Sequence, residues 1–343
     1  MKNRIFAMAA LAAALFASCN KETEMINPTP EARPDGASVT ITLSSGDDAQ
    51  TRAFFDATAT AEAWEKSLSS LSVFTFNTSG DLILRRDFTV SELASKSATF
   101  SLPKSAAGTE CSFYAVANYD ASSAKTRSAL TALVEKSAGD YNGTFADVST
   151  KALRSGGFVM SGSTTKTVGA VNTSTQVGIT LKRTVAKVAL QTTIDPEFSE
   201  KYPGSITINS VKLSRAASQS LIVAGTPSTG TMTYTHTQTP GTASSKYNSL
   251  FYVYETGTLN AGSRVLLEIN ATYDSDGSSS TSDDRSDVTY SIELTGKAAG
   301  QILRNGYYRV AANITGLVGQ DCQVSVTVAD WETPVTQSVD LGA

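Results

Sequence analysis

Apolar and polar residues alternate along much of this chain, which is the pattern of β-strands that bury one face. The first clear run is ASVTITLSS, in which Val39, Ile41 and Leu43 are separated by hydroxyl side chains. A Gly-Asp-Asp turn follows it. The pattern predicts a first strand over 38–45 whose apolar residues face a core.

The alternation returns repeatedly further along the chain. LSVFTF and LILRRDFTV are joined by the turn NTSGD, which predicts a hairpin. Similar runs follow as CSFYAVANY, FVMSGS, SITINSVKLS, YNSLFYVYE, RVLLEINATY and VTYSIEL. Only a short stretch from Ala129 to Leu133 has some helical spacing, so helix should be minor. Strands of this kind between Ser-, Thr- and Gly-rich loops favour two β-sandwiches in tandem.

Chain length and one pair of charged residues indicate how the strands divide between domains. The chain has 343 residues, too many for one ordinary sandwich and enough for two. A long β-branched run, VGITLKRTVAKVALQTTI, carries Lys182 and Arg183 at its middle. We interpret this charged pair as the boundary between an N-terminal β-sandwich over 38–183 and a C-terminal β-sandwich over 184–343.

The first residues have the features of an export signal. Lys2 and Arg4 precede an apolar stretch that ends at Phe16 and is too short to span a bilayer comfortably. Residues 1–18 are therefore predicted to be a signal peptide. The segment LFASC resembles a bacterial lipobox, which predicts lipidation of Cys19 by fatty acyl chains such as palmitate. An ordinary signal peptide with an incidental cysteine is the alternative.

The segment after the signal has no strand or helix pattern. Residues 19–37 are charged, contain prolines and lack periodicity. They are predicted to be a lipidated tether, or propeptide, with the reach of a flexible linker.

The end of the chain is rich in strand-forming residues. The region 323–343 reads QVSVTVADWETPVTQSVDLGA. It predicts either a permanent last strand of the C-terminal domain or a strand that pairs with another molecule, because a β-prone chain end can do both. The apolar residues with strand spacing in this region are Val324, Val326, Val328, Val335, Val339 and Leu341.

Composition and motifs offer little for catalysis. The formal net charge is −4 and no basic run exists, so nothing favours nucleic-acid binding. His236 is the only histidine and lies in a Thr-rich stretch, which predicts a surface side chain. Cys111 and Cys322 are expected to be buried thiols, with a disulfide between them as the alternative. We therefore expect no enzyme activity, no cofactor and no metal cluster. An acidic stretch without the spacing of a known calcium loop predicts a solvated loop at Asp274, Asp276, Asp283 and Asp284.

Arg52 stands out among the arginines. It follows the first predicted strand and the polar loop GDDAQT, and it precedes Ala53. An arginine in an exposed loop is where a trypsin-like or arginine-specific protease cuts. An ordinary loop arginine is the alternative. Polar residues also surround three other arginines, Arg33, Arg85 and Arg86. Of these four arginines, only Arg52 comes just after the first predicted strand.

Several segments, taken in order, carry a resemblance to a known family. They are LFASC, ASVTITLSS, TRAF around Arg52, LKRTVAKVAL, NGYYRVAANITG and CQVSVTVADWETP. Each motif is loose, but their order and spacing cover nearly the whole chain. The chain resembles the fimbrillins, the major fimbrial subunits and their relatives in Gram-negative anaerobes. The resemblance implies an all-β fold of two tandem transthyretin-like β-sandwich domains with minor helix.

The resemblance also implies a way of assembly. A lipoprotein precursor in the outer membrane is cut by an arginine-specific protease, here between Arg52 and Ala53. The lost segment includes Val39, Ile41 and Leu43, and its removal opens an apolar groove. The region 323–343 of an incoming subunit then fills the groove by donor-strand exchange, and the product is a cell-surface fimbrium that supports adhesion.

This resemblance sets the expected partners and leaves alternatives. The partners are other copies of the chain, accessory fimbrial subunits, the protease and, through the lipid, the outer membrane. A tip subunit would not need to donate a strand, and an anchor would keep Cys19 and escape cleavage. A surface glycan-binding lipoprotein is the other alternative.

Overall fold

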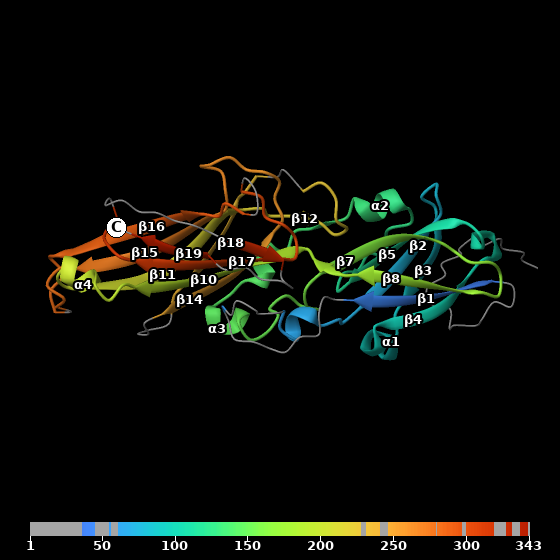
Figure 1. Cartoon of the computed structure of the whole chain (residues 1–343), viewed down its shortest axis with the longest axis horizontal. Coiled ribbons are helices and arrows are strands. Elements are labelled where there is room, and N and C mark those ends of the chain that lie inside the picture. Colours follow the sequence, from blue (N-terminus) through green and yellow to red (C-terminus); the bar gives the residue numbers. More distant parts are fainter. Residues whose placement is uncertain are drawn as a thin grey trace, which may run out of the picture.

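The computed structural model describes residues 36–44, 55, 61–227, 231–240, 246–278, 280–296, 300–318, 327–330 and 337–341. Strands make up 47% of the fold and helices 11%, which confirms an all-β fold with minor helix. Figure 1 shows the strands gathered in two bodies that follow each other along the long axis.

The first body has two sheets, whose strands lie between Ala37 and Arg183. Their buried side chains share one apolar core, in which Val39 and Phe100 of one sheet pack with Phe113 of the other. The smaller sheet has the order β4-β1-β8, with β4 at Ser97–Leu102, β1 at Ala37–Ser44 and β8 at Ser174–Thr180. The larger has the order β3-β2-β5-β7-β9, with bounds Leu82–Asp87, Leu71–Phe76, Glu110–Ala117, Met160–Thr167 and Lys182–Arg183.

The second body repeats the two-sheet plan. Its core packs Val188 and Val310 of one sheet with Ile269 of the other. One sheet has the order β14-β10-β17, with β18 and β19 along β17, at Tyr247–Tyr254, Val185–Ile194, Gly306–Ile314, Thr327–Asp330 and Gln337–Leu341. The other has the order β13-β11-β15-β16, at Tyr234–Gln238, Ser205–Ala216, Leu266–Asp274 and Arg285–Glu293.

Two local predictions are confirmed. The segments around NTSGD form the antiparallel hairpin of β2 and β3, and a strand is found at Ala37–Ser44, one residue before its predicted start. Lys182–Arg183 forms β9 in the first body, and the next strand, β10, belongs to the second. On this basis we propose a domain boundary between residues 183 and 184.

Helices are short and lie between strands. They are α1 at Val90–Ser95, α2 at Arg127–Thr131, α3 at Phe145–Val148 and α4 at Phe198–Lys201. The 3-10 turns are η1 at Trp64–Lys66, η2 at Lys104–Ala106 and η3 at Ala138–Tyr141. Two-residue strands β6 at Val134–Glu135 and β12 at Ser220–Leu221 pair across the two bodies.

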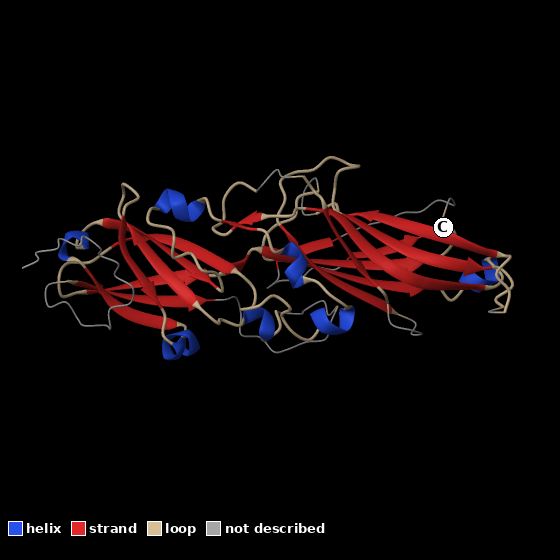
Figure 2. Ribbon diagram, turned by 180° about the vertical axis from the view of Figure 1, so that it is seen from behind, coloured by secondary structure: helices blue, strands red, loops and turns tan. Residues whose placement is uncertain are grey.

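The two bodies meet in a packed junction. Tyr252, Tyr254 and Tyr307 of the second body belong to the apolar core of the first, next to Trp64 and Phe158. Figure 2 shows helical turns and loops between the two sets of strands at this level. Because protein cores are close-packed, the junction joins the two bodies firmly.

Candidate functional site

β1 is the middle strand of its sheet, drawn in blue between β4 and β8 in Figure 1. It runs antiparallel to β4, with Ile41 opposite Ala98, and parallel to β8, with Ile41 opposite Val177. The amide of Leu181 donates to the carbonyl oxygen of Ser44 over 2.8 Å, so pairing reaches the end of the strand. Withdrawing β1 would therefore leave two rows of unpaired backbone groups facing each other.

The two faces of β1 differ sharply. Val39 and Ile41 are 0% exposed and Leu43 is 5% exposed, whereas Thr42 and Ser44 are exposed. Burying one such aliphatic side chain contributes about 1.5–3 kcal/mol. β1 has no charged residue, so apolar packing and backbone hydrogen bonds hold it. A strand of the same alternation could replace it in these pockets.

The C-terminal strands lie along the outer edge of β17. β18 runs antiparallel to its first part, with Val328 opposite Tyr308. β19 runs parallel to its second part, with Val339 opposite Ala312 and Leu341 opposite Ile314. In the described part of the chain each of them pairs with β17 alone. Together, β18 and β19 therefore form the edge of this sheet, one along each half of β17. This arrangement is the starting point for either interpretation of the region 323–343, as a permanent last strand or as a strand that pairs with another molecule.

Several predicted site residues lie outside the described residues. They are Cys19, Arg52, Ala53, Val324, Val326 and Val335. Cys322 is also outside, while Cys111 is a buried free thiol. Burial raises the pKa of Cys111, which keeps it protonated and unreactive.

A buried ionic cluster joins the two bodies at the junction. Glu65 is 0% exposed, and its Oε1 lies 2.8 Å from Lys187 Nζ and accepts a hydrogen bond of 2.7 Å from the Tyr252 hydroxyl. Arg183 Nε donates to the Glu65 carbonyl oxygen over 2.9 Å, and Arg183 Nη1 donates to Asn305 over 2.7 Å. Burial alone would raise the pKa of Glu65, but Lys187 and Arg183 outweigh it and lower that pKa.

A second buried carboxylate lies nearby. Glu135 Oε1 accepts a hydrogen bond of 2.8 Å from Tyr141 and lies 2.8 Å from Arg154 Nε. Its Oε2 accepts from Thr184 over 2.8 Å. Here burial prevails over these partners and raises the pKa of Glu135. Each carboxylate oxygen of Glu65 and Glu135 has a hydrogen-bond donor. Both clusters therefore serve to hold the two bodies together.

Of these junction residues, only Arg183 was singled out from the sequence, and its contacts with Glu65 and Asn305 were not predicted. A signal was present, because Lys187 lies inside TVAKVAL and Arg309 inside YYRVAA, charged residues within otherwise apolar runs. Charged residues at such positions are buried only when they are paired. The identity of the partner, Glu65, depends on tertiary contacts that a local pattern does not contain.

The predicted surface position of His236 is corrected. Its side chain is half-buried, with its ring stacked on Tyr234 and edge-on to Phe251 at centroid distances of 6.3 and 5.7 Å. Its Nε2 lies 3.1 Å from the carbonyl oxygen of Gly143. The packing of these two aromatic rings accounts for its burial.

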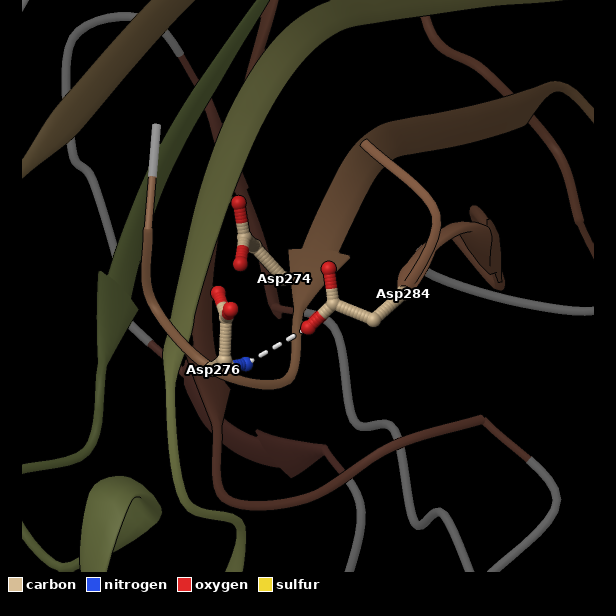
Figure 3. A group of neighbouring side chains, drawn as sticks. All are labelled: Asp274, Asp276 and Asp284. Carbon is tan, nitrogen blue, oxygen red and sulfur yellow. Dashed lines mark hydrogen bonds between the residues drawn. The ribbon is translucent and has the colours of Figure 1, made fainter. Parts of the chain in front are cut away.

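Three of the four acidic loop residues come together at the end of β15 (Figure 3). Asp274, Asp276 and Asp284 offer oxygens within 4.8 Å of one another. The amide of Asp276 donates to Asp284 over 2.8 Å, and Arg285 Nε lies 3.0 Å from Asp274. Hydrogen bonds from Ser275 and from the amide of Asp276 lower the pKa of Asp284. Arg285 supplies a local counter-charge, and Asp274 is buried rather than solvated as predicted.

No helix in the described ranges is long and apolar enough to cross a membrane. The sequence matches the family model of the major fimbrial subunit protein FimA over residues 37–295. The chain belongs to this family. As a member of the FimA family it is a fimbrial subunit. It belongs to a cell-surface fimbrium and assembles with other subunits. The resemblance to the fimbrillins is thereby confirmed.

Solved structures share the FimA-family fold. A fimbrilin from Porphyromonas gingivalis W83 is similar with 16% identity and a TM-score of 0.58, over 90% of this chain and 98% of that one. A fimbrial assembly protein from Parabacteroides distasonis ATCC 8503 is similar with 16% identity and a TM-score of 0.52, over 88% and 98%. At these identities the likeness concerns the fold alone. No curated protein sequence matches this member of the FimA family.

Proposed function

We propose that this chain is a shaft subunit that polymerises by protease-mediated donor-strand exchange. The precursor would be an outer-membrane lipoprotein held through Cys19, and an arginine-specific protease would cut between Arg52 and Ala53. The observation that carries the proposal is the position of β1, a central strand with one fully buried apolar face that lies between the lipobox and Arg52 in the sequence.

The groove left by β1 supplies the driving force in this proposal. Refilling it buries the pockets of Val39, Ile41 and Leu43 again, at about 25 cal/mol per Å² of apolar surface. It also restores backbone pairing along both β4 and β8. Because each subunit gives one strand and accepts one, the contact is heterologous and grows a filament.

The C-terminal region 323–343, here called the tail, is the proposed donor strand. Val324, Val326 and Val328 repeat the i, i+2, i+4 spacing of the β1 pocket residues, and polar residues separate them in both segments. Val335, Val339 and Leu341 match the spacing less regularly, because Gln337 takes the position between the first two. Donation requires the tail to leave the β17 edge, where it pairs with one strand, for a groove where it pairs with two.

The first experiment determines the N-terminal residue of the protein on the surface of its native cells. Mass spectrometry should find Ala53 in the polymer and no lipid. The Arg52→Lys variant should keep lipid-modified Cys19 and fail to polymerise, while the matched Arg33→Lys variant should behave as the wild type. An intact, lipid-modified wild-type chain would instead indicate an anchor subunit or a surface glycan-binding lipoprotein.

A further inference from the structure

Phe55 lies at the junction, three residues after Arg52. Its carbonyl oxygen accepts a hydrogen bond of 2.5 Å from Arg309 Nη2. The Arg309 guanidinium lies over its ring, with 4.7 Å from Cζ to the ring centroid. The backbone φ of Phe55 is 70°, a left-handed conformation that a bulky residue seldom adopts. Such a conformation persists where the surroundings hold it, and Arg309 makes both a polar and a cation–π contact to it.

Arg309 is itself fixed in the second body. Its side chain is almost fully buried, with the residue 3% exposed. It belongs to β17, where its backbone lies between Ala189 of β10 and Thr327 of β18. Ten residues beyond Phe55, Glu65 is anchored to Lys187. The chain after the proposed cut is therefore held to the second body at two points.

The open end of the β1 groove lies near the same junction. Ser44, the last residue of β1, is paired with Thr180 of β8, three residues before Arg183, which donates to the Glu65 carbonyl oxygen. Ser44 therefore ends β1 near the junction that holds Phe55. The new chain end would read Ala-Phe-Phe, an apolar sequence like that of the strand it replaces at the N-terminus.

We propose that Arg309 is a positioning residue that holds Phe55 at the junction and so keeps the new chain end out of the emptied groove. The proposal rests on the proposed cut after Arg52. A tethered apolar segment competes strongly with an incoming strand, because its effective concentration near the groove reaches the millimolar range. Holding Phe55 removes that competitor and leaves the groove to the partner subunit.

The first test follows the ring of Phe55 directly. 4-Fluorophenylalanine is placed at position 55 of the full chain, and its ¹⁹F signal is recorded with a soluble paramagnetic agent. The wild-type ring should be protected before and after cleavage, and the Arg309→Gln variant should expose it. The Arg85→Gln variant is the matched control, since Arg85 lies over Phe74 at 5.9 Å, away from the junction. Equal protection in the wild type and the Arg309→Gln variant would overturn the proposal.

The second test measures binding of a synthetic peptide of residues 323–343 to the cleaved protein. The Arg309→Gln variant should bind about tenfold more weakly, the factor expected from one partly buried cation–π contact. Adding Phe54→Ser should restore the affinity, a rescue that general damage to the fold would not permit. Unchanged affinity, or no rescue, would overturn the proposal. Failure of the wild type to bind the peptide would count against strand exchange itself, and the ¹⁹F result would then still decide whether Arg309 holds Phe55.

Discussion

The first and last strands of this chain occupy opposite kinds of position. β1 is the centre of a three-stranded sheet, is paired on both sides and turns an apolar face into the core. β18 and β19 lie at a sheet edge, are paired with β17 and divide its length between them. Loss of a central strand exposes two backbone edges and a row of pockets, whereas loss of an edge strand exposes one edge.

In the proposed strand exchange, this difference sets the direction. A tail that moves from an edge to a central position gains a second row of backbone partners, and net gains of about 0.5–1.5 kcal/mol per hydrogen bond add along a strand. The reverse move would lose them. If the proposed exchange occurs, the groove binds the C-terminal strand more strongly than the β17 edge does. The following substitutions test this contrast between the central strand and the edge strands.

The largest effect is expected for Ile41→Asp. The substitution places a carboxylate without a counter-charge at a position that is 0% exposed. We expect a loss of about 4–5 kcal/mol in the free energy of unfolding, at the upper end for a single substitution. Chemical denaturation of the full chain measures it. Thr42→Asp, on the exposed face of the same strand, is the matched control and should change stability by about 0.5 kcal/mol or less.

A smaller loss of stability is expected for Glu65→Gln, which tests the junction between the body that contains β1 and the body that contains β17. It leaves Lys187 buried without its ion pair, so unfolding should become easier by about 3 kcal/mol. The lowered pKa of Glu65 also sets a pH dependence. Its contribution is complete above the ordinary value of 4.5 and is lost as the pH falls through the lower folded pKa.

Denaturation curves between neutral and acidic pH measure this contribution. The wild type should lose stability in the acidic range more steeply than the Glu65→Gln variant, because only the wild type has this carboxylate to protonate. Parallel curves would show that Glu65 contributes nothing to the acid sensitivity. Lys212→Gln is a suitable control, because its ion pair with Glu268 lies partly exposed at the surface and is worth about 1 kcal/mol or less.

Much of the architecture could be predicted from local pattern. Alternation in ASVTITLSS indicates a half-buried strand whatever its neighbours are, and the turn NTSGD between two β-rich runs indicates a hairpin. The central position of β1 could not be predicted in this way. It depends on pairing with Ser97–Leu102 and Ser174–Thr180, and alternation does not specify which strands are partners.

The same limit explains the errors at single residues. His236 was expected at the surface because its neighbours are threonines, but it is half-buried and packs with Tyr234 and Phe251. Asp274 was expected in a solvated loop, but it ends β15 and is buried beside Arg285. Sequence neighbours define a local environment, whereas burial depends on residues that are distant in the sequence.

The smallest effect on the isolated subunit is expected for Leu341→Asp, the edge counterpart of Ile41→Asp. Residue 341 ends β19 and pairs with Ile314 at a sheet edge, where strand ends open at little cost. We expect the free energy of unfolding to fall by about 1 kcal/mol or less. Polymer formation should nevertheless decrease strongly if this residue enters the groove, since a carboxylate would then occupy an apolar pocket. Electron microscopy of the fimbriae and denaturation of the monomer measure the two quantities separately. A large loss of monomer stability with normal fimbriae would favour the permanent last strand and remove the contrast between centre and edge.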